Sequence, residues 1–104
     1  MAQTVQVTYF TVTPGMELDF IDLCVRAKKL HMRLGATNVI LARVMVGANP
    51  GQFIYNLAFE SAEAYGKFAD TVSTDSEWLA LWAEGVKRQV GTASGSRLST
   101  LIDI

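Results

Sequence analysis

The sequence has few of the residues from which redox and metal sites are built. It contains one cysteine, Cys24, and one histidine, His31, in 104 residues. A single cysteine cannot form a disulfide within the chain, and one histidine leaves a zinc site short of ligands. On a common helix the two residues would be two turns apart, about 10 Å, too far to share an ion. We therefore expect neither a metal site nor an internal disulfide.

An excess of charge of one sign is also lacking. Nine lysine and arginine residues face ten aspartate and glutamate residues, for a formal net charge of −1. Nucleic-acid and anionic-membrane partners are not expected, because such interfaces need a large basic excess. No apolar run approaches the roughly 18 residues of a bilayer span, and MAQTVQVTYF does not resemble a signal peptide. With the single cysteine, these features predict a soluble protein in a reducing, cytoplasmic setting.

Apolar residues are abundant. They make up 50% of the chain, and charged residues only 18%, against about 25% in an ordinary domain. A chain of this length has room for one domain, here residues 1–104. So small and so apolar a domain is expected to cover part of its surface with a second copy of itself.

The first half of the chain predicts a strand followed by a helix. Residues 5–12 are rich in β-branched and aromatic side chains, which favour a strand. Thr13 is placed as a helix N-cap with Pro14 at the first helical position. Apolar residues then recur at spacings of three and four over 16–34, the pattern of one buried helix stripe. Gly35 is expected to end this helix.

The second half predicts a hairpin, two helical pieces and a last strand. Residues 38–46 and 52–60 read as strands joined by the turn sequence GANPG. Ser61 is expected to cap a helix that continues to Val72. The sequence Thr74-Asp75-Ser76-Glu77 has the form of a capping box and predicts the start of a third helix. The stretch GTASGS is expected to be a loop before a strand at 97–104.

This order of elements, βαββαβ, predicts a ferredoxin-like α+β fold with a four-stranded antiparallel sheet and its helices on one face. With a hairpin loop at 47–52, Val46 would lie opposite Phe53 and Arg43 opposite Asn56. Alternation along the strands then assigns two faces. The helix-facing set would be Ile40, Ala42, Val44, Val46, Phe53, Tyr55, Leu57 and Phe59. The open set would be Val39, Leu41, Arg43, Met45, Ile54, Asn56, Ala58 and Glu60.

The open face is mostly apolar, so we expect a homodimer in which two sheets face each other, as in a dimeric α+β barrel. Arg43 and Asn56 interrupt this face, and a buried arginine needs a partner. One interpretation is a salt bridge from Arg43 to Glu60 or Asp103. The other is a polar spot that orients an anionic or carbonyl-bearing ligand.

Three stretches carry a resemblance to a known group of proteins. They are TPG at 13–15, NPGQFIYNLAFESAEAYGKFAD at 49–70 and DSEWLALWAE at 75–84. Together they resemble small proteins of the dimeric α+β barrel superfamily, especially its NIPSNAP-like members. That superfamily includes antibiotic-biosynthesis monooxygenases, which oxidise polycyclic phenols without metal or flavin, and haem-degrading oxygenases. The resemblance implies the dimeric barrel and no cofactor, while the chemistry is left open.

The only histidine lies in RAKKLHMRLGA at 26–36, which holds four of the nine basic residues. This helix starts acidic and ends basic, so its charges complement the helix dipole, and Asp22 and Arg26 have the favoured spacing of four. We interpret the basic residues as a solvated helix end. His31 itself is either a half-packed boundary residue or an acid or base in a pocket. The haem ligand of the haem-degrading relatives comes from a later helix, so haem binding is not carried over.

Aromatic residues supply the remaining candidates. Tyr9, Tyr55, Phe68, Trp78 and Trp82 are either core or the walls of a site for a flat ligand. One hypothesis is a cofactor-independent, monooxygenase-like enzyme for an aromatic or quinone-like substrate, walled by Tyr9, Tyr55 and Trp78. In it His31 or Arg43 orients a substrate oxygen, with Asn56 and Trp82 nearby. The alternative is a non-catalytic dimeric module that binds a small ligand or a protein partner.

Overall fold

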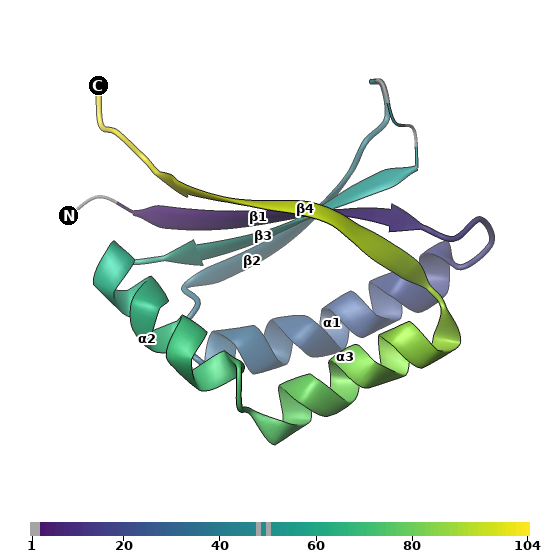
Figure 1. Ribbon diagram of the computed structural model, residues 1–104. Helices are drawn as coiled ribbons and strands as arrows, with labels where there is room; N and C mark the ends of the chain where they lie inside the picture. The colour runs from purple at the N-terminus through teal and green to yellow at the C-terminus, as the bar shows by residue number, and fades with distance from the viewer. Residues whose placement is uncertain (1–2, 48, 50) are drawn as a thin grey trace.

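The computed structural model describes residues 3–47, 49 and 51–104, and it has the predicted α+β fold. Its elements are β1 (Thr4–Val12), α1 (Glu17–Arg33), β2 (Asn38–Arg43), β3 (Gln52–Phe59), α2 (Ala62–Val72), α3 (Ser76–Arg88) and β4 (Gly91–Thr100). The strands form one antiparallel sheet in the order β2-β3-β1-β4. All three helices lie on one face of this sheet, and the opposite face carries no helix (Figure 1).

The core forms where the α1 stripe meets the inner face of β3. Burial alternates strictly along β3, as expected for a strand with one covered face. The buried hydrophobic members of the two elements are Phe20, Leu23, Ala27 and Leu30 from α1 and Phe53, Tyr55, Leu57 and Phe59 from β3. Full burial of one such side chain contributes about 1.5–3 kcal/mol. These residues therefore hold the main helix against the centre of the sheet.

Two of the predicted helix caps are corrected by the structure. Ser61 does cap α2, with its hydroxyl accepting from the Ala64 N–H at 3.1 Å. The cap of α3 is Asp75 and not Thr74, because the Asp75 carboxylate accepts the Trp78 N–H at 2.9 Å. Thr13 does not cap α1. The turn after β1 places Thr13 outside the helix, where its hydroxyl donates to the Gln89 carbonyl at 2.7 Å.

The predicted boundary of the last strand was wrong. β4 begins at Gly91, so the stretch expected to be a loop is strand, and residues 101–104 lie outside it. The whole of β1 is available as a partner, and a bulge at Ser94 keeps the pairing in step. Gly91 is required where β4 begins, since a Cβ there would lie 2.6 Å from the Thr11 carbonyl oxygen. Pairing with β1 thus overrides the small, polar composition of this segment.

The predicted hairpin register was also wrong. Arg43 lies opposite Phe53 and not Asn56, a displacement of three residues, and Ile40 is the residue opposite Asn56. An odd displacement turns β2 over. Val39 is therefore buried against the helices, whereas Ile40 is 55% exposed on the open face. The cause is a longer connection: β2 ends at Arg43 rather than at 46. Residues 48 and 50 of the expected turn lie outside the described part of the chain.

Candidate functional site

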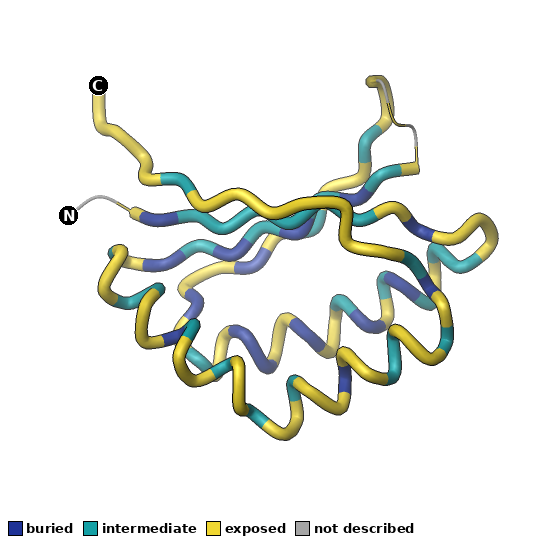
Figure 2. Tube along the Cα trace, viewed as in Figure 1, coloured by how far each residue is buried: buried dark blue, intermediate teal, exposed yellow. Residues whose placement is uncertain are grey.

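A cavity of about 890 Å³ lies between the inner face of the sheet and the helices α1 and α3. It is partly open to solvent, and β4 is exposed along most of its length (Figure 2). Of the described residues that line it, none is an aspartate, glutamate, lysine or arginine. The polar ones are Gln6, Thr8, Thr13, Cys24, His31, Tyr55, Gln89, Thr92 and Ser96. The cavity is therefore apolar, with neutral hydrogen-bonding groups, as is typical of small-molecule sites.

His31 and Tyr55 form the most buried polar contact of this cavity. His31 comes from the last two turns of α1 and is 3% exposed. Its Nδ1 lies 2.8 Å from the Tyr55 hydroxyl on β3. Rings surround the imidazole, with the centroid of Trp78 at 4.5 Å and that of Phe68 at 5.6 Å. His31 is therefore fully packed against aromatic rings and is not the half-solvated boundary residue that one interpretation expected.

Burial keeps the ionisable groups of the cavity uncharged. It lowers the pKa of His31 to about 4, and it raises the pKa of the Tyr55 hydroxyl well above its usual value. The pKa of the Cys24 thiol is raised by burial to about 12. At neutral pH the site thus holds an imidazole, a phenol and a thiol, all neutral. Such groups exchange hydrogen bonds with a ligand but offer no ion pair.

The two nitrogens of the His31 ring differ in their hydrogen bonding. Nδ1 is engaged by Tyr55, and which of the two atoms donates depends on the tautomer. Nε2 makes no hydrogen bond within the described part of the chain, and it is not among the fully buried unsatisfied polar atoms. Since His31 lines the cavity, Nε2 is the atom free to contact a ligand.

Trp78 and Trp82 of α3 line the helical side of the cavity. Their ring centroids are 5.7 Å apart. Trp82 is 44% exposed although it is a large apolar residue, which places it at the open side of the cavity. These tryptophans line the same cavity as Phe68 and Tyr55, whereas Tyr9 does not line it.

Three of the predicted site residues lie elsewhere. Arg43 is outside the cavity, with its guanidinium carbon 5.2 Å from the Phe53 ring centroid. Asn56 is on the open face of the sheet, where its amide donates to the Ile40 carbonyl at 3.1 Å. Tyr9 is on that face too, beneath the Arg97 guanidinium at 5.9 Å. The predicted pairing of Arg43 with Asn56 and the predicted wall at Tyr9 were therefore wrong for a single chain.

Arg43 does not form the predicted salt bridge either. Within the described part of one chain, no ion pair joins Arg43 to Glu60 or to Asp103. The odd shift in register is the reason, since it moves Arg43 to the helix-covered side at the edge of the sheet. There the stacking on Phe53 replaces the expected partner.

Sequence reasoning missed Gln6, Thr8 and Ser96, which line the cavity from β1 and β4. Thr8 Oγ1 lies 3.2 Å from Ser96 Oγ, and Gln6 Nε2 donates to Ser96 Oγ at 3.3 Å. The signal was present in the sequence as the alternation of polar and apolar residues in TVQVTYFTV. That alternation shows two unlike faces, and only the fold shows that the polar face is the inner one.

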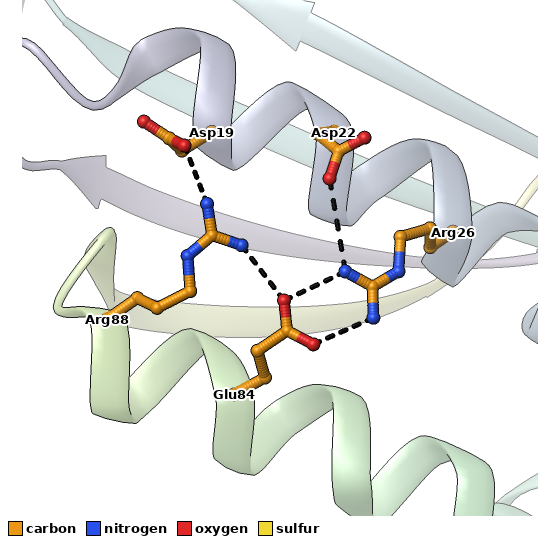
Figure 3. A network of polar contacts seen from close by, with 5 residues as sticks. All are labelled: Asp19, Asp22, Arg26, Glu84 and Arg88. Atoms are coloured by element: carbon orange, nitrogen blue, oxygen red, sulfur yellow. Dashed lines mark hydrogen bonds and ion pairs between the residues drawn. The ribbon is translucent and has the colours of Figure 1, made fainter.

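The basic residues near His31 connect α1 to α3, rather than only facing solvent. Arg26 binds both carboxylate oxygens of Glu84 at 2.8 Å (Figure 3). Arg88 contacts Glu84 at 2.9 Å and Asp19 at 2.6 Å, while Asp22 lies 3.9 Å from Arg26. Hydrogen bonds from Arg26 and Arg88 lower the pKa of Glu84 to about 2. The network fixes α3, and with it the tryptophans, over the cavity.

Neither family models nor curated protein sequences match this chain. Solved structures do. SnoaB from Streptomyces nogalater, a cofactor-independent oxygenase, is 16% identical with a TM-score of 0.74, covering 100% of this chain and 97% of that one. A NIPSNAP family protein from Agrobacterium tumefaciens is 15% identical with a TM-score of 0.71, covering 98% and 93%. A candidate antibiotic biosynthesis monooxygenase from Bordetella bronchiseptica is 20% identical with a TM-score of 0.70, covering 100% and 99%.

The chain has the fold of these proteins. At identities of 20% or less, the likeness establishes architecture and leaves the chemistry to the site. Two structural observations bear on the other predicted properties. Across the described residues, no helix has the length and apolarity needed to cross a membrane. In the same part of the chain, no three histidine, cysteine, aspartate or glutamate residues are grouped so that they can hold a metal ion.

Proposed function

We propose that the cavity binds a neutral aromatic ring compound and that the protein is a monooxygenase-like enzyme that uses dioxygen without a cofactor. The observation that carries the proposal is the cavity itself, which is large, is lined by no charged side chain of the described residues, and is edged by the neutral His31–Tyr55 pair. Burying a charged ligand among such groups is costly, whereas a flat apolar ring matches the tryptophan wall. The fold shared with SnoaB supports the oxygenase part.

The proposed chemistry takes its electrons from the substrate. A ring compound with an activated CH₂ group loses one proton to solvent at the open side of the cavity, and the resulting carbanion passes electrons to dioxygen as a C–O bond forms. The peroxide takes up a proton and loses water, so that R₂CH₂ and O₂ give R₂C=O and H₂O. One oxygen atom enters the product and the other leaves as water. The protein's part is to bind, orient and desolvate the ring.

His31 serves in this scheme as a hydrogen-bonding group rather than a strong base. With a pKa of about 4, the imidazole lies about six units below a phenol of ordinary pKa near 10, and full proton transfer between them would cost about 8 kcal/mol. A hydrogen bond from or to Nε2 has no such cost. His31 is therefore assigned to holding an oxygen of the substrate.

The alternative function is a module that binds the same kind of ligand without catalysis. It is favoured by one observation: the His31 Nδ1 is occupied by Tyr55, and among the described residues Cys24 is the only other ionisable group that lines the cavity. Both functions predict binding, and only the first predicts consumption of dioxygen.

We also propose that the protein is a homodimer formed through the open face of the sheet. That face carries apolar side chains, including Val5, Val7 and the exposed Ile40. The C-terminal residues and the ends of β2 and β3 both project to that side (Figure 1). Two large apolar residues of these segments are exposed, Met45 after β2 and Ile102 after β4. A second copy would cover all of these apolar side chains.

Incubation with anthrone and ¹⁸O₂ tests the proposed reaction. The proposal predicts dioxygen uptake above the protein-free rate, and anthraquinone that carries a single ¹⁸O atom by mass spectrometry. His31→Gln is expected to lower the rate. Binding of anthrone with no uptake above the protein-free control would favour the non-catalytic module, and absence of binding would contradict both functions.

A further inference from the structure

Between Val5 and Thr8, β1 presents polar side chains to the cavity and apolar side chains to the opposite face. Gln6 and Thr8 line the cavity, whereas Val5 and Val7 alternate with them on the open face. Packing alone favours the reverse order, because polar groups turned toward an apolar interior cost free energy. The neighbouring strand β3 follows the usual order and buries only apolar residues and Tyr55. The inward polar groups of β1 therefore need another explanation.

These groups converge with a third side chain on β4. Ser96 pairs with Thr8 across the sheet, and its hydroxyl lies 3.2 Å from Thr8 Oγ1 and 3.3 Å from Gln6 Nε2. Both contacts are long for hydrogen bonds. A hydroxyl has one donor and two acceptor sites, so the three side chains retain capacity for a further partner. Their position in the cavity lining leaves that capacity facing the cavity.

The group lies in line with the His31–Tyr55 pair. Tyr55, Thr8 and Ser96 occupy one row across β3, β1 and β4. Adjacent strands are about 4.8 Å apart, so Ser96 is roughly 10 Å from Tyr55 across the floor of the cavity. Polar groups thus stand at both sides of an otherwise apolar floor.

We infer that Gln6, Thr8 and Ser96 form a second recognition point, which hydrogen-bonds an oxygen of the ligand on the β4 side while His31 holds an oxygen on the α1 side. The ligand class is a neutral compound of two or three fused rings with a hydroxyl or carbonyl oxygen toward each end, because a single ring is too short to reach both points. This inference rests on the ligand-binding part of the proposed function and not on the oxygenation.

Matched naphthols test the second recognition point. Binding of 2,6-dihydroxynaphthalene and of 2-naphthol is measured by quenching of tryptophan fluorescence. A neutral hydrogen bond is worth about 0.5–1.5 kcal/mol, so the wild-type protein should bind the diol about 2- to 10-fold more tightly. In Thr8→Val/Ser96→Ala the two affinities should become equal, with 2-naphthol bound as before. A diol preference that survives in this variant would overturn the inference.

Controls separate the inference from the proposed function and from folding. Thr11→Val changes the same kind of residue on the open face of β1 and should keep the diol preference. Wild-type protein that binds 2-naphthol and the diol equally would overturn the second recognition point alone. Failure to bind either probe would overturn the proposed function and this inference together. Loss of folding in the double variant, with an unchanged diol preference in folded Ser96→Ala, would assign these hydroxyls to structure and overturn the inference.

Discussion

The Nδ1 atom of His31 lies 2.8 Å from the hydroxyl of Tyr55, and this contact joins α1 to β3 at the buried side of the cavity. Neither residue has another side-chain hydrogen bond within the described part of the chain. Each therefore depends on the other for its only buried polar partner. This contact therefore affects both the stability of the fold and the hydrogen-bonding properties of the site.

Removing the Tyr55 hydroxyl tests that dependence. Tyr55→Phe keeps the ring in the core but leaves His31 Nδ1 without a partner. An unsatisfied buried polar group costs about 1–3 kcal/mol, so the free energy of unfolding should fall by that amount in urea denaturation. Tyr65→Phe is the matched control, since no hydrogen bond of the Tyr65 hydroxyl is found in the described residues. Equal effects of the two substitutions would show that the contact contributes nothing.

The buried imidazole predicts a dependence of stability on pH. The pKa of His31 is lowered to about 4 by burial, against 6.5 for an ordinary histidine. Between these values the unfolded chain takes up a proton that the folded chain does not, so stability is full above about pH 6.5 and is lost as pH falls toward 4. The total loss is on the order of 3 kcal/mol. His31→Gln should lack this component, which is obtained by subtracting the two pH profiles of unfolding free energy.

The same pKa can be observed directly. The imidazole C–H signals of His31, the only histidine in the chain, should titrate near pH 4 in proton NMR. A midpoint near 6.5 in the folded protein would contradict the buried, neutral site.

The ion-pair network between α1 and α3 predicts a second acid transition. Glu84→Gln removes the carboxylate that binds both Arg26 and Arg88, and it should lower Tm at neutral pH. Arginine hydrogen bonds lower the pKa of Glu84 to about 2 from 4.5. The stabilisation should therefore be present above pH 4.5 and disappear as pH falls toward 2. Glu63→Gln breaks only an exposed contact to Lys67 and should leave Tm nearly unchanged. Equal changes in Tm for the two variants would show that the network does not stabilise the fold.

The open sheet face predicts the oligomeric state. Light scattering should give twice the 11.4 kDa mass of one chain. Ile40→Arg places a charge on the open face of β2, within the proposed interface, and should give the monomer mass with an unchanged circular dichroism spectrum. Val25→Arg, at an equally exposed position on α1 (54% against 55%), should leave the dimer intact. A wild-type monomer at micromolar concentration would contradict the proposed dimer.

Much of this fold was predictable because its elements have strong periodic patterns. The α1 stripe and the alternation of β3 depend on one face being covered, and both were confirmed. β4 was not predictable from GTASGS, since pairing with β1 makes this composition a strand. The predicted register of β2 was wrong because residue type again did not match the structure. Val44 and Val46 have side chains typical of strands but belong to the connection.

The site was predictable in part. His31, Tyr55 and the tryptophans were named as candidates because an imidazole and large aromatic rings are unusual in composition or pattern, and all of them line the cavity. Arg43 and Asn56 were paired through a register error of three residues. Thr8 and Ser96 were missed because a threonine and a serine in strands look ordinary until the sheet shows which face is covered. Residue type singled out His31 and Tyr55 separately, and only the fold shows their contact and the groups on the opposite side.

The cavity is expected to prefer neutral ring compounds, and two ligands of nearly identical shape test this preference. They are 2-acetylnaphthalene, which is neutral, and 2-naphthoate, which carries a carboxylate at pH 7, with dissociation constants obtained by isothermal titration calorimetry. Because no cationic side chain of the described residues lines the cavity, the proposed function predicts that the ketone binds at least about tenfold more tightly than the anion. Equal or tighter binding of 2-naphthoate would contradict it.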